Sequence, residues 1–212
     1  SLMVSCGAGE GDRVAIPCRN RIEFFELMLG CAKLGAILVP LNWRMPPCEL
    51  DQLIEDAGPK LLFYGCEDEA AVPALAGRLR TIGLDDDYEA RLAGAPERRW
   101  RSHWPGDGIW YLLYTSGTTG RPKGVVYTFR MAYANYVNIG SAIDLRSTDR
   151  TANFLPLFHT AGINLHALPT LMAGGRVIVL PGFDADALVG LFEGRGIDTF
   201  FGVPTVFQDL VG

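Results

Sequence analysis

Short strand-like and helix-like segments alternate along this chain, and that alternation constrains its fold more than any other feature. In the helix-like segments, apolar residues recur every three or four positions, and Gly35 ends the first of them. The expected elements are a strand at 14–16, a helix over 22–34, a strand at 36–39, a helix between Pro46 and Gly58, and a strand at 61–64. Such alternation predicts a parallel sheet with helical crossovers.

Residues 78–107 interrupt this pattern, because they are rich in charge, contain Gly and Pro, and show little periodicity. The alternation then resumes with strands at 109–114, 125–128, 152–155, 177–180 and 199–203 and with helices at 129–139 and 184–195. We therefore predict an α/β chain with a first portion at 1–84, a charged connection at 85–107 and a second α/β portion at 108–212.

A loop rich in glycine and hydroxyl groups lies between two of the expected strands. Its glycines allow the backbone to approach a ligand closely, and its hydroxyl and N–H groups can donate to phosphate oxygens. Lys123 adds a mobile positive charge. The segment reads Tyr114-Thr115-Ser116-Gly117-Thr118-Thr119-Gly120-Arg121-Pro122-Lys123-Gly124-Val125. This chemistry predicts a polyphosphate site.

The loop is not a Walker A loop. That pattern requires Gly, four residues and then Gly-Lys-Ser/Thr, whereas Pro122 is the fifth residue after Gly117 and Gly124 follows Lys123. A P-loop NTPase is therefore disfavoured. Composition alone leaves a second interpretation open, in which the segment is a Gly/Thr-rich hairpin without a ligand.

The twelve-residue segment closely resembles the phosphate-binding motif of the adenylate-forming superfamily, which includes acyl- and aryl-CoA synthetases, luciferases and peptide-synthetase adenylation domains. Other segments resemble the family pattern in its expected order, namely 11–15, 33–42, 155–159 and 202–205. Phe129 departs from it, because many relatives have His there. The resemblance implies parallel-sheet subdomains with flanking helices, as part of the large N-terminal domain of such an enzyme.

The family's reaction joins ATP and a carboxylic acid to an acyl-adenylate and releases pyrophosphate, and a thiol, commonly that of CoA, then accepts the acyl group. The resemblance therefore implies ATP, Mg²⁺ and CoA as cofactors and cosubstrates. Lys123 would act as an electrostatic clamp on the phosphates, not as a base. The matching nucleotide-binding positions are Thr115, Ser116, Gly117, Thr118, Thr119, Gly120 and Lys123.

A second segment, 158–162, is similar to the acyl-site motif of the CoA-ligase branch. A lone His in an apolar segment is more often a structural residue, but this resemblance implies that His159 borders the acyl carboxylate and the thiol path. Without such support, His166 is interpreted as structural. The resemblance assigns His159 a catalytic role, and the implied substrate-binding residues are His159, Thr160, Gly162, Gly202 and Pro204.

The residues around His159 also indicate a class of acid. Residues 151–175 contain no Asp, Glu, Lys or Arg, so no carboxylate is present to meet the ammonium group of an α-amino acid. A fatty acyl or aryl acid is favoured instead. Pro156, Pro169 and several polar side chains argue against a membrane-spanning helix in the same run.

Composition excludes further classes. Nineteen Lys and Arg against twenty-four Asp and Glu give a net charge of -5, which disfavours nucleic-acid binding through bulk charge. The five cysteines show neither a CxxC pair nor zinc-site spacing, so no metal-ligating set is predicted. Buried, reduced thiols and the lack of a recognisable secretion signal predict a cytoplasmic protein.

The family's later motifs and its small C-terminal domain are not found in these 212 residues. We therefore expect a fragment of an AMP-forming acyl-CoA synthetase that is inactive alone and needs its C-terminal domain. One alternative is a natural half-protein that binds nucleotide or acyl ligand without turnover. Another is an adenylation enzyme whose acceptor is a carrier-protein thiol.

Overall fold

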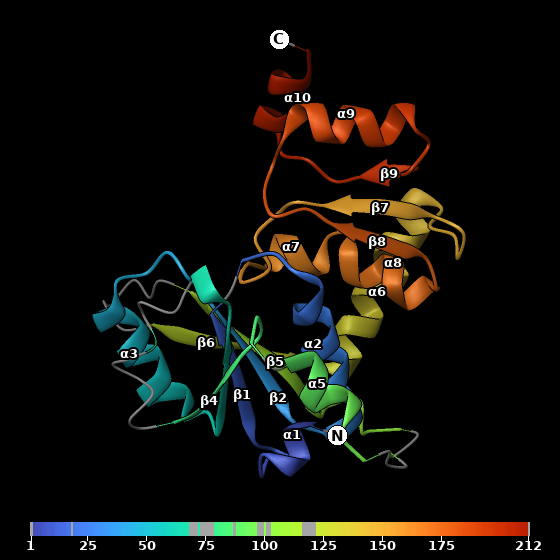
Figure 1. Ribbon diagram of the computed structural model, residues 1–212. Coiled ribbons are helices and arrows are strands. Elements are labelled where there is room, and N and C mark those ends of the chain that lie inside the picture. Colours follow the sequence, from blue (N-terminus) through green and yellow to red (C-terminus); the bar gives the residue numbers. More distant parts are fainter. Residues whose placement is uncertain are drawn as a thin grey trace. The chain divides into compact units, whose positions relative to one another are not determined.

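The computed structural model describes residues 2–17, 19–67, 72, 79–86, 88–96, 100, 103–115 and 122–211. The chain divides into two compact units, Ser1–Arg130 and Met131–Gly212. Each unit is built around its own sheet with its own helices, as an α/β chain requires (Figure 1).

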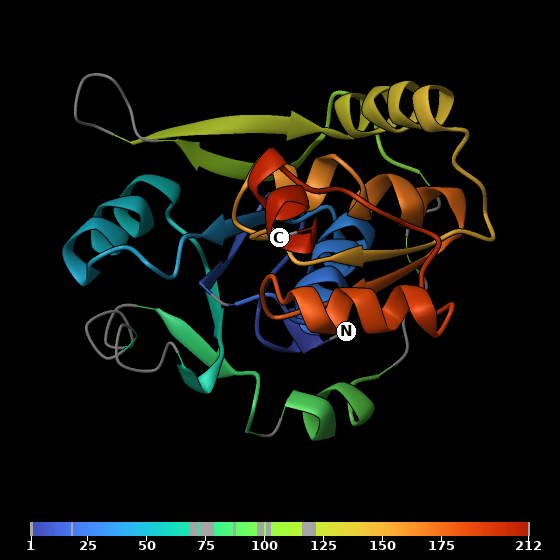
Figure 2. The same ribbon diagram turned by 90° about the horizontal axis from the view of Figure 1, so that it is seen from above.

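The first unit contains a six-stranded sheet. In sheet order its strands are β4 (Arg80–Gly83), β3 (Leu61–Tyr64), β1 (Arg13–Pro17), β2 (Ile37–Leu41), β5 (Ile109–Thr115) and β6 (Lys123–Thr128). All neighbouring pairs are parallel except β5 and β6, which form an antiparallel hairpin at one edge (Figure 2). The predicted parallel sheet is confirmed, with this hairpin as an addition.

Helices α2 (Ile22–Leu34) and α3 (Pro47–Ala57) lie on either side of this sheet (Figure 1). Both end at glycines with positive φ, Gly35 at 75° and Gly58 at 53°, a conformation that glycine adopts without a steric penalty. The described part of this unit also contains two shorter helices, α1 (Leu2–Ser5) and α5 (Tyr88–Ala93).

The core of the first unit forms because side chains of a strand alternate between the two faces of a sheet. On one face, Leu50, Leu53 and Ile54 of α3 pack against strand residues such as Val39 and Leu62. Each fully buried Leu or Ile contributes about 1.5–3 kcal/mol. On the other face, the indole N–H of Trp110 donates to the carbonyl oxygen of Met28 in α2 at 2.9 Å. Trp110 thus anchors β5, the strand that leads into the predicted phosphate loop, to α2.

The charged stretch at 78–107 differs from the expectation of a plain connection. It contains strand β4, which pairs with β3, and helix α5. The division between the units also lies between Arg130 and Met131, not at 85–107, because β5 and β6 belong to the first sheet. The sequence did not reveal β4 because the strand has only four residues, of which only Ile82 is buried. A segment this short cannot show a hydrophobic period.

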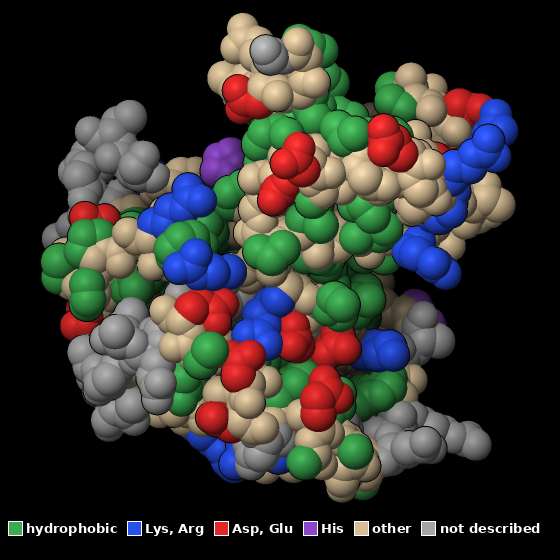
Figure 3. Space-filling view, turned by 45° about the horizontal axis from the view of Figure 1, so that its top comes forward, with side chains coloured by type: hydrophobic (Ala, Val, Ile, Leu, Met, Phe, Trp, Pro, Cys, Tyr) green, Lys and Arg blue, Asp and Glu red, His purple; other side chains and the backbone are tan. Residues whose placement is uncertain are grey.

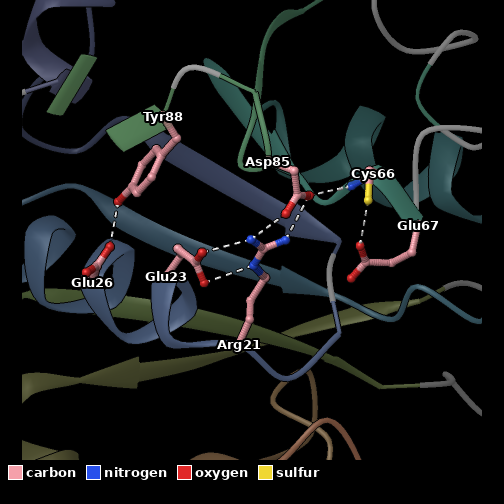
Figure 4. Close-up of polar contacts among 7 residues, drawn as sticks. All are labelled: Arg21, Glu23, Glu26, Cys66, Glu67, Asp85 and Tyr88. Atoms are coloured by element: carbon pink, nitrogen blue, oxygen red, sulfur yellow. Dashed lines mark hydrogen bonds and ion pairs between the residues drawn. The ribbon is translucent and has the colours of Figure 1, made fainter. Parts of the chain in front are cut away.

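An ion-pair network links the segment that follows β4 to the start of α2 (Figure 4). The Arg21 guanidinium contacts Oε1 of Glu23 and Oδ1 of Asp85, each at 2.8 Å. The hydrogen bond from Arg21 lowers the pKa of the Asp85 carboxyl from 3.8 to about 2. A lowered carboxyl pKa stabilises the fold at pH values above the ordinary pKa of the group. That stabilisation is lost as the pH falls toward the lowered pKa.

We therefore expect the stability difference between the wild type and Asp85→Asn to be largest above pH 3.8 and to shrink as the pH falls toward 2. Urea unfolding at several pH values measures it. The other carboxyl groups also become protonated in acid, but their effect on stability is the same in the wild type and in Asp85→Asn and therefore drops out of the difference. A difference that stayed constant or grew on acidification would contradict this account.

The second unit has a smaller, fully parallel sheet in the order β8 (Arg176–Val179), β7 (Arg150–Asn153) and β9 (Thr199–Phe200). Helices α9 (Ala185–Glu193) and α10 (Pro204–Val211) lie on one side, and α8 (Ala167–Ala173) lies on the other (Figure 1). Phe154, Leu188 and Val206 belong to its core. The other helices are α6 (Phe129–Ile143), which begins at the unit boundary, and α7 (Thr160–Asn164).

Among the described residues, no helix is both long enough and apolar enough to cross a bilayer. The uncharged run at 151–175 instead contains most of β7 and all of α7 and α8, whose side chains are largely buried. Its apolar character thus serves the interior of the second unit.

The cysteines bear out the expectation of buried thiols only in part. Cys6 and Cys31 are buried, whereas Cys48 and Cys66 are exposed, which corrects the expectation for these two. Burial raises the pKa of the Cys31 thiol far above its ordinary value, so this residue is a neutral core side chain. Cys18 lies outside the described residues.

Candidate functional site

The predicted phosphate loop joins the two strands of the β5–β6 hairpin. Thr115, the last residue of β5, pairs with Lys123, the first residue of β6, and Tyr114 pairs with Gly124. Both Thr115 and Lys123 are exposed. Five predicted nucleotide-binding residues between them lie outside the described residues, namely Ser116, Gly117, Thr118, Thr119 and Gly120. The described part agrees with the expected strand–loop–strand arrangement, which both interpretations of the segment share.

Positively charged residues follow β1 and β2, the two strands that precede β5 in the order of the sheet. β1, β2 and β5 are parallel neighbours, so the segments that follow them lie at the same sheet edge, where ligands of open α/β sheets bind. After β1 and β2, the guanidinium carbons of Arg19 and Arg44 lie 4.0 and 5.0 Å from the centroid of the Trp43 ring. Among described residues, Lys123 has no carboxylate partner. These residues and Lys123 offer positive charge to an anion at this part of the edge.

The hydrogen bond between Tyr114 and Asp56 was not predicted from the sequence. The hydroxyl group of Tyr114 donates to Oδ2 of Asp56, in α3, at 2.6 Å. Burial, followed by this hydrogen bond, raises the pKa of Tyr114 well above its ordinary value. Tyr114 is therefore a neutral donor at physiological pH. The only sequence signal was its position directly before the loop.

The predicted acyl segment begins with His159, which forms the N-cap of α7. Its Nδ1 accepts a hydrogen bond from the backbone N–H of Ala161 at 3.3 Å. This contact uses Nδ1 as an acceptor, so the proton of the neutral ring is on Nε2. The side chain is exposed. His159 thus has a local structural partner and still presents Nε2 to a ligand.

Two further residues of this segment hold α7 in place. Asn164 donates from its Nδ2 to Oγ1 of Thr160 at 3.0 Å, and Asn135 of α6 donates to the carbonyl oxygen of Asn164 at 2.7 Å. Gly162 is buried against the preceding turn, where an added Cβ would lie 2.2 Å from the carbonyl oxygen of Pro156. Thr160 and Gly162 therefore have structural roles beside any contact with a substrate.

Gly202 lies between β9 and α10, and Pro204 begins α10. An added Cβ on Gly202 would lie 3.0–3.2 Å from side-chain atoms of Val206, Phe200 and Phe207, so glycine permits close aromatic packing here. Pro204 is the first residue of α10, where its missing N–H costs no helical hydrogen bond. Apolar side chains such as Phe207, 49% exposed, remain accessible on this helix, and Figure 3 shows apolar side chains at the surface.

His166 has a partner within its own unit. Its Nε2 lies 3.0 Å from Oγ1 of Thr199 in β9, and burial lowers the pKa of its imidazole. A neutral, hydrogen-bonded imidazole that links α8 to β9 agrees with the structural role expected for it. The β5–β6 hairpin, with the predicted phosphate loop, belongs to the first unit, and the His159 and Gly202 segments belong to the second.

One cluster of possible metal ligands is present among the described residues. The ligand atoms of Cys66, Glu67 and Asp85 lie within 4.8 Å of one another, and all three residues are exposed. Asp85 already accepts hydrogen bonds from Arg21 and from the backbone N–H of Cys66 (Figure 4). Its negative charge also raises the pKa of the Cys66 thiol, which disfavours the thiolate that a metal requires. We therefore assign no metal to this cluster.

The chain is similar to known proteins along its whole length. The family model described as AMP-binding enzyme matches residues 1–212. A feruloyl-CoA synthase of Amycolatopsis sp is 36% identical over 211 residues, which cover 96% of this chain and 41% of that protein. The long-chain-fatty-acid–CoA ligase FadD13 of Mycobacterium tuberculosis is 32% identical, with 98% of this chain and 42% of the relative covered.

Solved structures agree with these matches. ATP-bound MatB from Rhodopseudomonas palustris superimposes with a TM-score of 0.88 at 30% identity, covering 99% of this chain and 42% of that chain. The present chain thus spans about two-fifths of the length of these relatives.

Proposed function

The chain belongs to the family of AMP-binding enzymes, and from this premise we propose that the full-length protein activates a carboxylic acid with ATP and transfers the acyl group to the thiol of CoA. The observation that carries the proposal is the loop end of the β5–β6 hairpin. There Thr115 and Lys123 are paired and exposed at the carboxyl edge of the parallel strands. This placement suits the phosphates of a bound nucleotide.

The proposed reaction brings two anions together, so the charge between them must be neutralised. The carboxylate attacks the α-phosphate of ATP, an acyl–phosphate bond forms, and pyrophosphate leaves with the electron pair of the broken bond. Lys123 would stabilise the departing phosphates electrostatically, and Mg²⁺ bound with ATP would add to this neutralisation. The hydroxyl of Thr115, with the hydroxyl and N–H groups of residues 116–120, would donate hydrogen bonds to phosphate oxygens.

We propose a fatty acyl or aryl acid as the substrate. The run at 151–175 offers no charged side chain to an ammonium group, and Gly202 and Pro204 lie beside accessible apolar side chains of α10. The names of the relatives point the same way, because one is a feruloyl-CoA synthase and another a long-chain-fatty-acid–CoA ligase. His159, held as an N-cap with Nε2 exposed, would orient the carboxylate or border the thiol path.

The proposal is tested by incubating the full-length protein with ATP, Mg²⁺ and a panel of acids, with CoA or a phosphopantetheinylated carrier protein as acceptor. Mass spectrometry then detects the acyl thioester. We expect CoA thioesters of ferulic acid or of fatty acids, and none of α-amino acids. If thioesters formed only on the carrier protein, the acceptor would be the carrier-protein thiol and not CoA. Nucleotide or acyl binding without any adenylate would support the non-catalytic alternative.

A further inference from the structure

The contact between Tyr114 and Asp56 lies where β5 leads into the phosphate loop. Tyr114 directly precedes Thr115, and its hydroxyl reaches Oδ2 of Asp56 in α3 at 2.6 Å. The two residues are 58 positions apart in the chain, so the contact joins two separate elements of the first unit. Hydrogen bonds with an ionised acceptor are among the stronger ones in proteins.

The ring of Tyr114 also lies against the other strand of the hairpin. Tyr114 and Gly124 are paired in register, and a Cβ added to Gly124 would lie 3.4 Å from Cζ of Tyr114. A Cβ at position 124 would therefore be in van der Waals contact with the ring. Lys123 precedes Gly124 and pairs with Thr115. A fixed Tyr114 ring therefore fixes both described ends of the loop.

Asp56 carries a carboxylate at an unfavourable position of helix α3. It lies in the last turn of the helix, where the helix dipole disfavours a negative charge. Arg13 offsets this cost, because its Nε and Nη2 donate to the carbonyl oxygens of Ala57 and Gly58 at 2.8 and 3.0 Å. The stability of α3 itself thus gives no reason for a carboxylate here, whereas the contact with Tyr114 does.

We propose that Asp56 and Tyr114 are positioning residues, which hold Thr115 and Lys123 at the spacing that the phosphates of the nucleotide require. The inference rests on the proposed function, because it takes the loop to bind the phosphates of ATP. The anchor is rigid, since Tyr114 packs against the core cluster that contains Leu50, Leu53 and Ile54 of α3. The hydrogen bond fixes the hydroxyl end of the Tyr114 ring, so it sets the orientation of the side chain as well as its packing.

The test measures the dissociation constant of ATP–Mg²⁺ by titration calorimetry and the KM values for ATP and acid, in the full-length protein. Tyr114→Phe and Asp56→Ala should each weaken ATP binding about fivefold, a factor that matches the ordinary net strength of one hydrogen bond. The double variant should bind no more weakly than either single variant. Asp56→Asn keeps an acceptor oxygen and should restore most of the affinity. The KM for the acid should not change.

A matched control exists in the same unit. The Tyr88 hydroxyl in α5 donates to Oε2 of Glu26 in α2 at 3.0 Å, which is also a tyrosine–carboxylate hydrogen bond between two elements (Figure 4). Neither residue belongs to the hairpin. Tyr88→Phe should alter thermal stability to a similar extent and leave the dissociation constant of ATP unchanged.

The outcomes separate this inference from the proposed function. Unchanged ATP affinity in Tyr114→Phe, or an equal loss in Tyr88→Phe, would overturn the positioning role. A wild type that binds ATP but forms no acyl-adenylate would overturn the proposed function, and the dissociation constants would still decide the inference. A wild type without ATP affinity would overturn both.

Discussion

Replacement of Lys123 by Ala in the full-length protein is expected to slow adenylate formation about 100-fold, the scale of losing one electrostatic contact to a charge that develops in the transition state. Lys123 begins β6 opposite Thr115 and is exposed, so its removal should not disturb the core. The measurement is single-turnover formation of acyl-adenylate at saturating ATP and acid.

The control for this variant is Lys33→Ala. Lys33 is an exposed residue in the last turn of α2, outside the hairpin. It should leave the rate of adenylate formation unchanged. If Lys123→Ala retained the wild-type rate while Thr115 and the loop were intact, Lys123 would lose its assigned role as the electrostatic clamp.

Replacement of Gly162 by Ala is expected to destabilise the second unit by about 2 kcal/mol, because the new Cβ would lie 2.2 Å from the carbonyl oxygen of Pro156. Relief of that clash requires α7 to move, and His159 forms the N-cap of this helix. Acid binding should therefore weaken along with stability. Thermal unfolding and the KM for the acid measure the two effects.

Gly190→Ala is the matched control, because a Cβ at Gly190 in α9 meets no atom within 4 Å. Alanine is the better helix former, so this variant should be as stable as the wild type or more stable by about 0.5–1 kcal/mol. Equal unfolding midpoints for the two variants would show that the contact with Pro156 does not restrict position 162.

The elements with a clear hydrophobic period were predictable from the sequence. The helix at 22–34 and the strand at 61–64 have the expected bounds, because apolar spacing and terminal glycines define them locally. Helices α7 and α8 were missed because residues 151–175 are uncharged throughout and show no clear amphipathic period. The expected strand at 199–203 is short because the helix beginning at Pro204 follows it closely.

The candidate site was predictable from the sequence only where its functional residues follow one another along the chain. The phosphate loop and the His159 segment are of this kind, and the structure places Thr115 and Lys123 opposite each other at the end of one hairpin. The contact of Tyr114 with Asp56 depends on how β5 packs beside α3, which no local pattern encodes. The N-cap role of His159 likewise depends on where α7 begins.

The most direct test of the account is acid-dependent exchange of labelled pyrophosphate into ATP, measured with the full-length protein. Exchange occurs only if adenylation is reversible on the enzyme, so it reports the proposed first step without any thiol acceptor. We predict exchange that requires a fatty or aryl acid and is slowed about 100-fold in Lys123→Ala. Robust binding of ATP and acid without exchange would contradict the proposal that this protein forms an acyl-adenylate.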